Sequence, residues 1–76
     1  MLINKDARPA DSIYYIACCI IEELKGLNTV FVDDGYYIIK EQYNKSLKYT
    51  DYHLALNFLF LIEKIVFKEG RLNYVH

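Results

Sequence analysis

The sequence has few of the residues that build crosslinked or nucleotide-binding proteins. Its only cysteines, Cys18 and Cys19, are adjacent, and in a helix their side chains diverge by about 100°, which prevents a normal disulfide between them. Its three glycines, Gly26, Gly35 and Gly70, are isolated from one another, which excludes a glycine-rich phosphate loop. We therefore expect neither a disulfide scaffold nor a nucleotide site, and we interpret both cysteines as small hydrophobic residues.

Long apolar segments are also missing. The longest unbroken apolar run, Ile13–Ile21, has nine residues, whereas a helix needs roughly 20 to cross a bilayer. No apolar stretch precedes the first charged residues after Met1, so we expect no secretory signal. These features predict a cytoplasmic protein without a membrane segment.

Hydrophobic residues nevertheless make up 54% of the 76 residues, and 8 tyrosines and 4 phenylalanines are among them. With the glycines added, this share exceeds the ~45–50% that is usual for globular domains. The net charge of -1, together with the apolar content, excludes intrinsic disorder and gives no general attraction to phosphate. A domain this small buries only roughly 60% of its unfolded surface, so we expect apolar side chains in excess of one core.

The hydrophobic pattern predicts one domain over residues 1–76, mostly α with a C-terminal β-hairpin (α+β). The expected elements are an extended lead (1–11), a helix over Ser12–Lys25 ended by Gly26, a strand (29–32), a helix over Gly35–Asn44, a helix over Asp51–Lys64 capped by Thr50 or Asp51, and a wing hairpin (65–75). The order helix, short strand, helix, helix and hairpin is that of a winged-helix domain, a fold that hosts many functions.

Helical spacing assigns one face of the first and third helices to the core. The predicted inward residues are Ile13, Ala17, Ile20 and Leu24 in the first helix, and Leu54, Ala55, Phe58, Leu61 and Ile62 in the third. The outward apolar residues are then Tyr15, Cys18, Cys19, Tyr37, Leu56 and Phe60. Such exposed apolar sets are typical of partner sites, and the alternative is that the aromatic residues fill the core.

No catalytic, cofactor or metal site is predicted. His53 and His76 lack a metal-ligand spacing, and His53 is interpreted as a surface residue. A small basic patch could form from Lys40, Lys45 and Lys48. The predicted outward side of the third helix carries few groups that read bases, so nucleic acid is expected to make at most a weak backbone contact within a complex.

Three segments resemble the small middle components of ABC-three-component systems. They are Asn4–Ile16, whose opening is fairly specific, His53–Ile65, which is similar to the third helix leading into the wing, and the Glu69–Leu72 turn. The resemblance implies a non-enzymatic winged-helix subunit of a bacterial anti-phage or conflict system. In such a system the middle component bridges an SMC-like ATPase and an effector-bearing subunit.

The resemblance also implies which residues meet the partner. The matching positions of its opening motif are Asn4, Lys5, Asp6, Arg8, Pro9, Ser12, Tyr14 and Tyr15. We expect Ser12 to cap the first helix, Lys5, Asp6 and Arg8 to make polar rim contacts, and Tyr14 and Tyr15 to anchor in a partner pocket.

Two other functions fit the same residues. The first is a small winged-helix DNA-binding regulator or antitoxin-like protein, which the element order and the lysine patch favour. The second is a phage-type inhibitor that uses its apolar face to block a host enzyme. In isolation, a homodimer through the first or third helix would cover the apolar excess.

Overall fold

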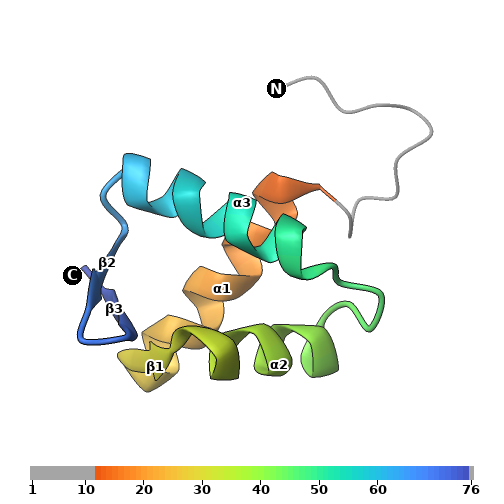
Figure 1. The fold of residues 1–76 in the computed structure, drawn as a ribbon, viewed down its shortest axis with the longest axis horizontal. Coiled ribbons are helices and arrows are strands. Elements are labelled where there is room, and N and C mark those ends of the chain that lie inside the picture. The colour runs from red at the N-terminus through yellow and green to blue at the C-terminus, as the bar shows by residue number, and fades with distance from the viewer. Residues whose placement is uncertain (1–11, 76) are drawn as a thin grey trace.

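The computed structural model describes residues 12–75, which form three helices and a three-stranded antiparallel sheet (Figure 1). In chain order the elements are α1 (Ile13–Leu27), β1 (Thr29–Phe31), α2 (Val32–Gln42), α3 (Tyr49–Leu61), β2 (Ile65–Lys68) and β3 (Arg71–Tyr74). The predicted α+β class and the predicted element order are confirmed. The predicted lead over residues 1–11 lies outside the described residues.

The sheet joins the C-terminal hairpin to the short strand that follows α1. Its order is β1-β3-β2, and Val30 of β1 lies opposite Leu72 of β3. Glu69 and Gly70 form the turn between β2 and β3 with φ angles of 54° and 77°, the left-handed values that a type I′ hairpin turn requires at both positions. The hairpin was predicted from the sequence, whereas its pairing with β1 was not.

The helix ends differ from the predicted ones. Asn28, with φ 67°, is the C-cap of α1, and its N–H donates to the Leu24 carbonyl, so Gly26 lies inside the helix and does not end it. Asparagine adopts this left-handed conformation more readily than other side chains. Ser12 is the N-cap of α1, although its side chain makes no capping hydrogen bond.

The other two helices begin earlier than predicted. Asp33 and Asp34 lie in the first turn of α2, where carboxylates interact favourably with the positive end of the helix dipole, and Gly35 is therefore a helical residue. The N-cap of α3 is Lys48, so the predicted caps at Thr50 and Asp51 are wrong.

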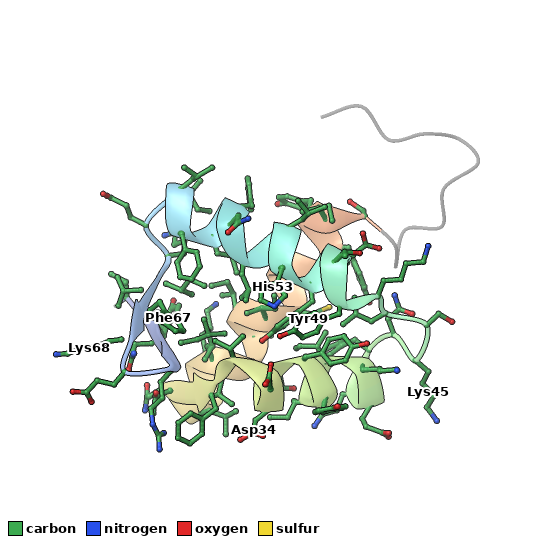
Figure 2. All side chains as sticks on the ribbon, in the orientation of Figure 1. Asp34, Lys45, Tyr49, His53, Phe67 and Lys68 are labelled. Atoms are coloured by element: carbon green, nitrogen blue, oxygen red, sulfur yellow. The ribbon has the colours of Figure 1, made fainter. Side chains whose placement is uncertain are left out.

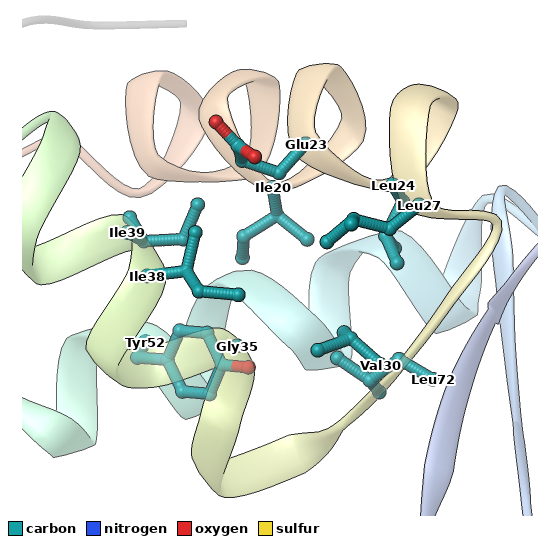
Figure 3. Close-up of a pocket in the computed structure, with 10 residues that line it drawn as sticks. All are labelled: Ile20, Glu23, Leu24, Leu27, Val30, Gly35, Ile38, Ile39, Tyr52 and Leu72. Atoms are coloured by element: carbon teal, nitrogen blue, oxygen red, sulfur yellow. The ribbon is translucent and has the colours of Figure 1, made fainter.

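All three helices and the inner face of the sheet enclose the core. The buried hydrophobic residues are Ile16, Ala17, Cys19, Ile20, Leu24, Ile39, Leu47, Tyr52, Ala55, Leu56, Leu59, Ile65 and Leu72. Tyr52 is completely buried, and its hydroxyl donates to the Val32 carbonyl at 2.7 Å. Figure 3 shows its ring against the turn of α2 that contains Gly35, beside a small cavity with room for about one water molecule.

The predicted inward face of α3 is wrong by about a third of a turn. The helix buries Tyr52, Ala55, Leu56 and Leu59. Of the five α3 residues that were predicted to face inward, only Ala55 is buried. The other four are exposed: Leu54, Phe58, Leu61 and Ile62. Because α3 is apolar on nearly all sides, periodicity alone did not separate its two faces, and Tyr52 was not counted as a core residue.

Candidate protein-interaction face

The exposed side of α3 is a continuous apolar stripe. Phe58, Leu61 and the C-cap residue Ile62 follow Leu54 by four, seven and eight positions. This spacing places all four side chains on one face. Leu61 is 83% exposed and Leu54 53% exposed. A soluble helix normally presents charged side chains on this side, and α3 presents leucine, isoleucine and phenylalanine instead.

α1 extends the apolar surface across the helix pair. Tyr14, Cys18 and Ile21 recur with helical spacing on the side of α1 that borders α3, and the Tyr14 ring meets the Phe58 ring edge-on, with centroids 6.5 Å apart. Together with Ile62, these side chains line a shallow groove between the two helices. We define the α1–α3 face by its six exposed residues: Tyr14, Cys18, Leu54, Phe58, Leu61 and Ile62.

Charged groups lie at the rim of this face. Glu22 and Lys25 form an ion pair at 3.8 Å on the exposed side of α1. Lys64, just beyond α3, lines the same groove. An apolar centre with a polar border is the usual composition of a protein–protein interface.

The structure separates the residues that the sequence assigned to the outward surface. Tyr14, Tyr15 and Tyr37 are exposed, as is Cys18. Cys19 and Leu56 are buried, so their predicted outward orientation is wrong. Phe60 is half-buried and packs against the core. Asn4, Lys5, Asp6, Arg8 and Pro9 lie outside the described residues.

Cys19 is buried on the side of α1 that the Tyr43 side chain approaches. Tyr43 is the C-cap of α2, and its hydroxyl donates to a Glu23 carboxylate oxygen at 3.1 Å on the neighbouring turn of α1. Burial raises the pKa of the Cys19 thiol above its usual range, which keeps it protonated at neutral pH. A protonated, buried thiol is a packing residue and not a nucleophile.

Leu54, Phe58, Leu61 and Ile62, the α3 residues of the α1–α3 face, were not among the residues predicted to face outward. Tyr52, Ala55, Leu56 and Leu59 have the same i, i+3, i+4, i+7 spacing as a core stripe. Counting Tyr52 as an apolar residue would have added this stripe as a second candidate, but periodicity alone would not have chosen between the two.

A cluster of aromatic rings joins α2 to α3. Tyr36 meets Tyr49 and Tyr52 edge-on with centroids 5.1 and 5.5 Å away, and Tyr49 lies 4.3 Å from the His53 ring. The Tyr49 hydroxyl donates to Asp33 at 2.7 Å, and this bond raises the pKa of Tyr49. The cluster holds the two helices together.

His53 is half-buried and not a freely solvated surface residue as predicted. Figure 2 shows His53 and Tyr49 between α2 and α3. The Nε2 atom of His53 is buried without a hydrogen-bond partner. Within residues 12–75 no three histidine, cysteine, aspartate or glutamate side chains are grouped as metal ligands would be.

The length and polarity of the helices bear on membrane insertion. Among the described residues, none of the helices combines the length and the apolar character that spanning a bilayer requires.

Comparison with known proteins supports the family resemblance. No curated protein sequence and no solved structure matches this chain. Residues 3–75, nearly the whole chain, match one family, and this confirms the resemblance inferred from the opening motif and the third helix. The chain belongs to the family of ABC-three component (ABC-3C) system Middle Component 6.

Proposed function

We propose that this chain is a non-catalytic protein-interaction subunit that bridges an SMC-like ATPase and an effector-bearing subunit in a bacterial anti-phage system. Its family places it in an ABC-three-component system as a middle component. The α1–α3 face is the observation that supports the interaction role, because exposed apolar patches of this kind mark partner sites on soluble proteins.

The α1–α3 face has the shape and composition to receive a partner. Tyr14 and Phe58 supply aromatic surface on opposite sides of the groove, and aromatic side chains are enriched among the residues that dominate binding energy. We propose that Tyr14 and Phe58 anchor the partner. We also propose that Asn4, Lys5, Asp6, Arg8 and Pro9 belong to the partner interface, with polar contacts from Lys5, Asp6 and Arg8.

The alternative DNA-binding function lacks support from α3. A helix that reads the major groove presents Arg, Lys, Asn or Gln to the base edges. From Tyr49 to Leu61 the helix contains no arginine or lysine, and its exposed stripe is apolar. Measurable duplex binding with steep salt dependence would favour the DNA-binding function instead.

Co-purification with the products of the neighbouring genes tests the proposal. We expect the tagged chain to retain both an ATPase and an effector subunit. Phe58→Asp should reduce the retained partner at least tenfold, because it places a charge in the centre of the apolar face. Asn57→Asp adds the same charge at an adjacent polar position and serves as the matched control.

Circular dichroism of both variants separates loss of binding from loss of folding. Phe58 is exposed, so we expect the Phe58→Asp helix signal to match that of the unmodified chain. The proposal is wrong if neither subunit co-purifies with the unmodified chain, or if folded Phe58→Asp retains both in full.

A further inference from the structure

The exposed stripe of α3 has charges of opposite sign at its two ends. Asp51 lies in the first turn of the helix, and Lys64 follows the C-terminal end. Because Asp51 precedes Phe58 by seven positions, the two side chains lie on the same side of α3. Phe58 and Lys64 both line the groove toward α1. The stripe is therefore flanked on its α1 side by an acidic group at one end and a basic group at the other.

Both of these charges are unpaired within residues 12–75. Neither Asp51 nor Lys64 has an ion-pair partner there, and Lys48, the N-cap of α3, makes no ion pair with Asp51. Glu63, next to Lys64, lines the hollow beside β2 and not the groove. The two charged residues of α1 in the groove pair with each other. A molecule that covers the stripe should therefore bring a basic group to one end and an acidic group to the other.

A second copy of α3 in antiparallel orientation carries these groups at the right spacing. Asp51 lies three positions before Leu54, and Lys64 lies three positions after Leu61. A pair that sets Leu54 against Leu61 of the other copy therefore sets Asp51 beside Lys64 of that copy. Two-fold symmetry repeats both contacts at the other end of the pair. The same arrangement covers Leu61, which is 83% exposed.

Other arrangements of two α3 helices match less well. A parallel pair would bring Asp51 against Asp51 and Lys64 against Lys64, and like charges across an interface are unfavourable. An antiparallel pair shifted to set Leu54 against Phe58 would set Leu61 against Asp51. Figure 1 shows α3 along one side of the described part of the chain and α2 along the opposite side, so α2 does not lie between the two copies.

We propose that two copies of the free chain pair through antiparallel α3 helices, and that this pairing covers the surface that receives the partner subunit. Asn57 and Phe58 of both copies then meet at the two-fold axis, so Phe58 cannot contact the second copy and the partner at the same time. One helix from each copy makes a small interface, which favours reversible pairing. The competition rests on the proposed bridging function, whereas the pairing itself does not.

Exchange of the end charges tests the pairing, with sedimentation equilibrium as the measurement. Asp51→Lys or Lys64→Asp alone should raise the dissociation constant of the homodimer roughly tenfold, because each creates two like-charge pairs per dimer. An equimolar mixture of the two variants should associate about as well as the unmodified chain, because opposite charges then meet at both ends. Lys45→Asp changes an exposed lysine of the connector after α2 and should leave the constant unchanged. Circular dichroism checks that each variant is folded.

A cross-linked dimer tests the competition. Asn57→Cys in a Cys18→Ser background places one exposed thiol per copy beside the two-fold axis, and Cys19 is buried. Diamide as oxidant should join the two thiols in a disulfide, whereas Lys45→Cys in the same background should not cross-link. The cross-linked dimer should fail to retain at least one of the two co-purifying subunits. The reduced form should retain both.

Several results would overturn the proposal. They are an unmodified chain that stays monomeric, single charge variants that associate as well as the unmodified chain, a mixture that associates no better than either variant alone, and a cross-linked dimer that retains both subunits in full. Failure of both subunits to co-purify with the reduced chain contradicts the proposed function, while the charge exchange still decides whether the α3 helices pair.

Discussion

Tyr52 connects three elements through one side chain. Its ring is completely buried on α3, its hydroxyl bonds to the first residue of α2, and its edge meets the Tyr36 ring. Gly35 allows this arrangement, because a Cβ at that position would meet the Tyr52 hydroxyl and approach Val30. The close packing of α2 on α3 therefore depends on the absence of a side chain at Gly35.

The two helical glycines should respond in opposite directions to alanine. Gly35→Ala should lower the free energy of unfolding by about 1–3 kcal/mol, since overpacking in a core outweighs the gain in helix propensity. Gly26 has open space around its Cβ position, so Gly26→Ala should be neutral or stabilise by up to about 1 kcal/mol. Urea unfolding measures both.

The double variant Gly35→Ala with Tyr52→Phe identifies the cause. Removing the Tyr52 hydroxyl removes the clash with the new Cβ at position 35. The double variant should therefore lose less unfolding free energy than the two single variants lose in sum. Strict additivity, or a Gly35→Ala chain as stable as the unmodified one, would contradict this account of the contact.

At the scale of the element, α3 is apolar on nearly all sides, and only its neighbours determine which side is buried. α1, α2 and β2 cover Tyr52, Ala55, Leu56 and Leu59. The opposite stripe is left to solvent or to a partner. The same helix therefore provides both core residues and most of the α1–α3 face.

A pair of leucines on α3 tests this assignment directly. Leu56 is 2% exposed and Leu54 is 53% exposed. Leu56→Ala should destabilise the chain by about 2–5 kcal/mol, whereas Leu54→Ala should change the free energy of unfolding by no more than about 0.5 kcal/mol. Chemical unfolding of the two variants under identical conditions gives the comparison, and equal losses would show that the assignment of the faces is wrong.

At the scale of the whole molecule, residues 12–75 expose apolar side chains in more than one place: on the α1–α3 face, and at Val66 and Phe67 of β2. Figure 1 shows the hairpin at one end of the helices. A subunit that bridges two others needs more than one contact surface, so this arrangement supports the proposed role.

Without its partners, the chain should self-associate through the α1–α3 face. We expect a homodimer in light scattering at tens of micromolar, because a two-fold pair of these faces would cover the exposed apolar stripes. Phe58→Asp should restore the monomer. A monomeric unmodified chain at this concentration would contradict the expectation.

The tyrosines predict how stability depends on alkaline pH. Burial raises the pKa of Tyr52, and a hydrogen bond to Asp33 raises that of Tyr49. Because the raised pKa belongs to the folded state, stability should be unaffected by these groups below about pH 10, the usual tyrosine pKa, and should fall above it. Thermal unfolding from pH 8 to 11 measures this loss, which should be smaller for Tyr52→Phe. An equal loss in that variant would exclude Tyr52 as a cause.

The element order, the hairpin with its Glu69–Gly70 turn, and the family could be inferred from the sequence, because they depend on local propensities and on a contiguous motif. The sequence also established that the chain has more apolar residues than one core requires. Tertiary packing set which side of α3 faces inward, the burial of Cys19, and the pairing of β1 with the hairpin. Those outcomes depend on contacts between residues far apart in the chain, and a helix that is apolar on all sides carries no local signal for them.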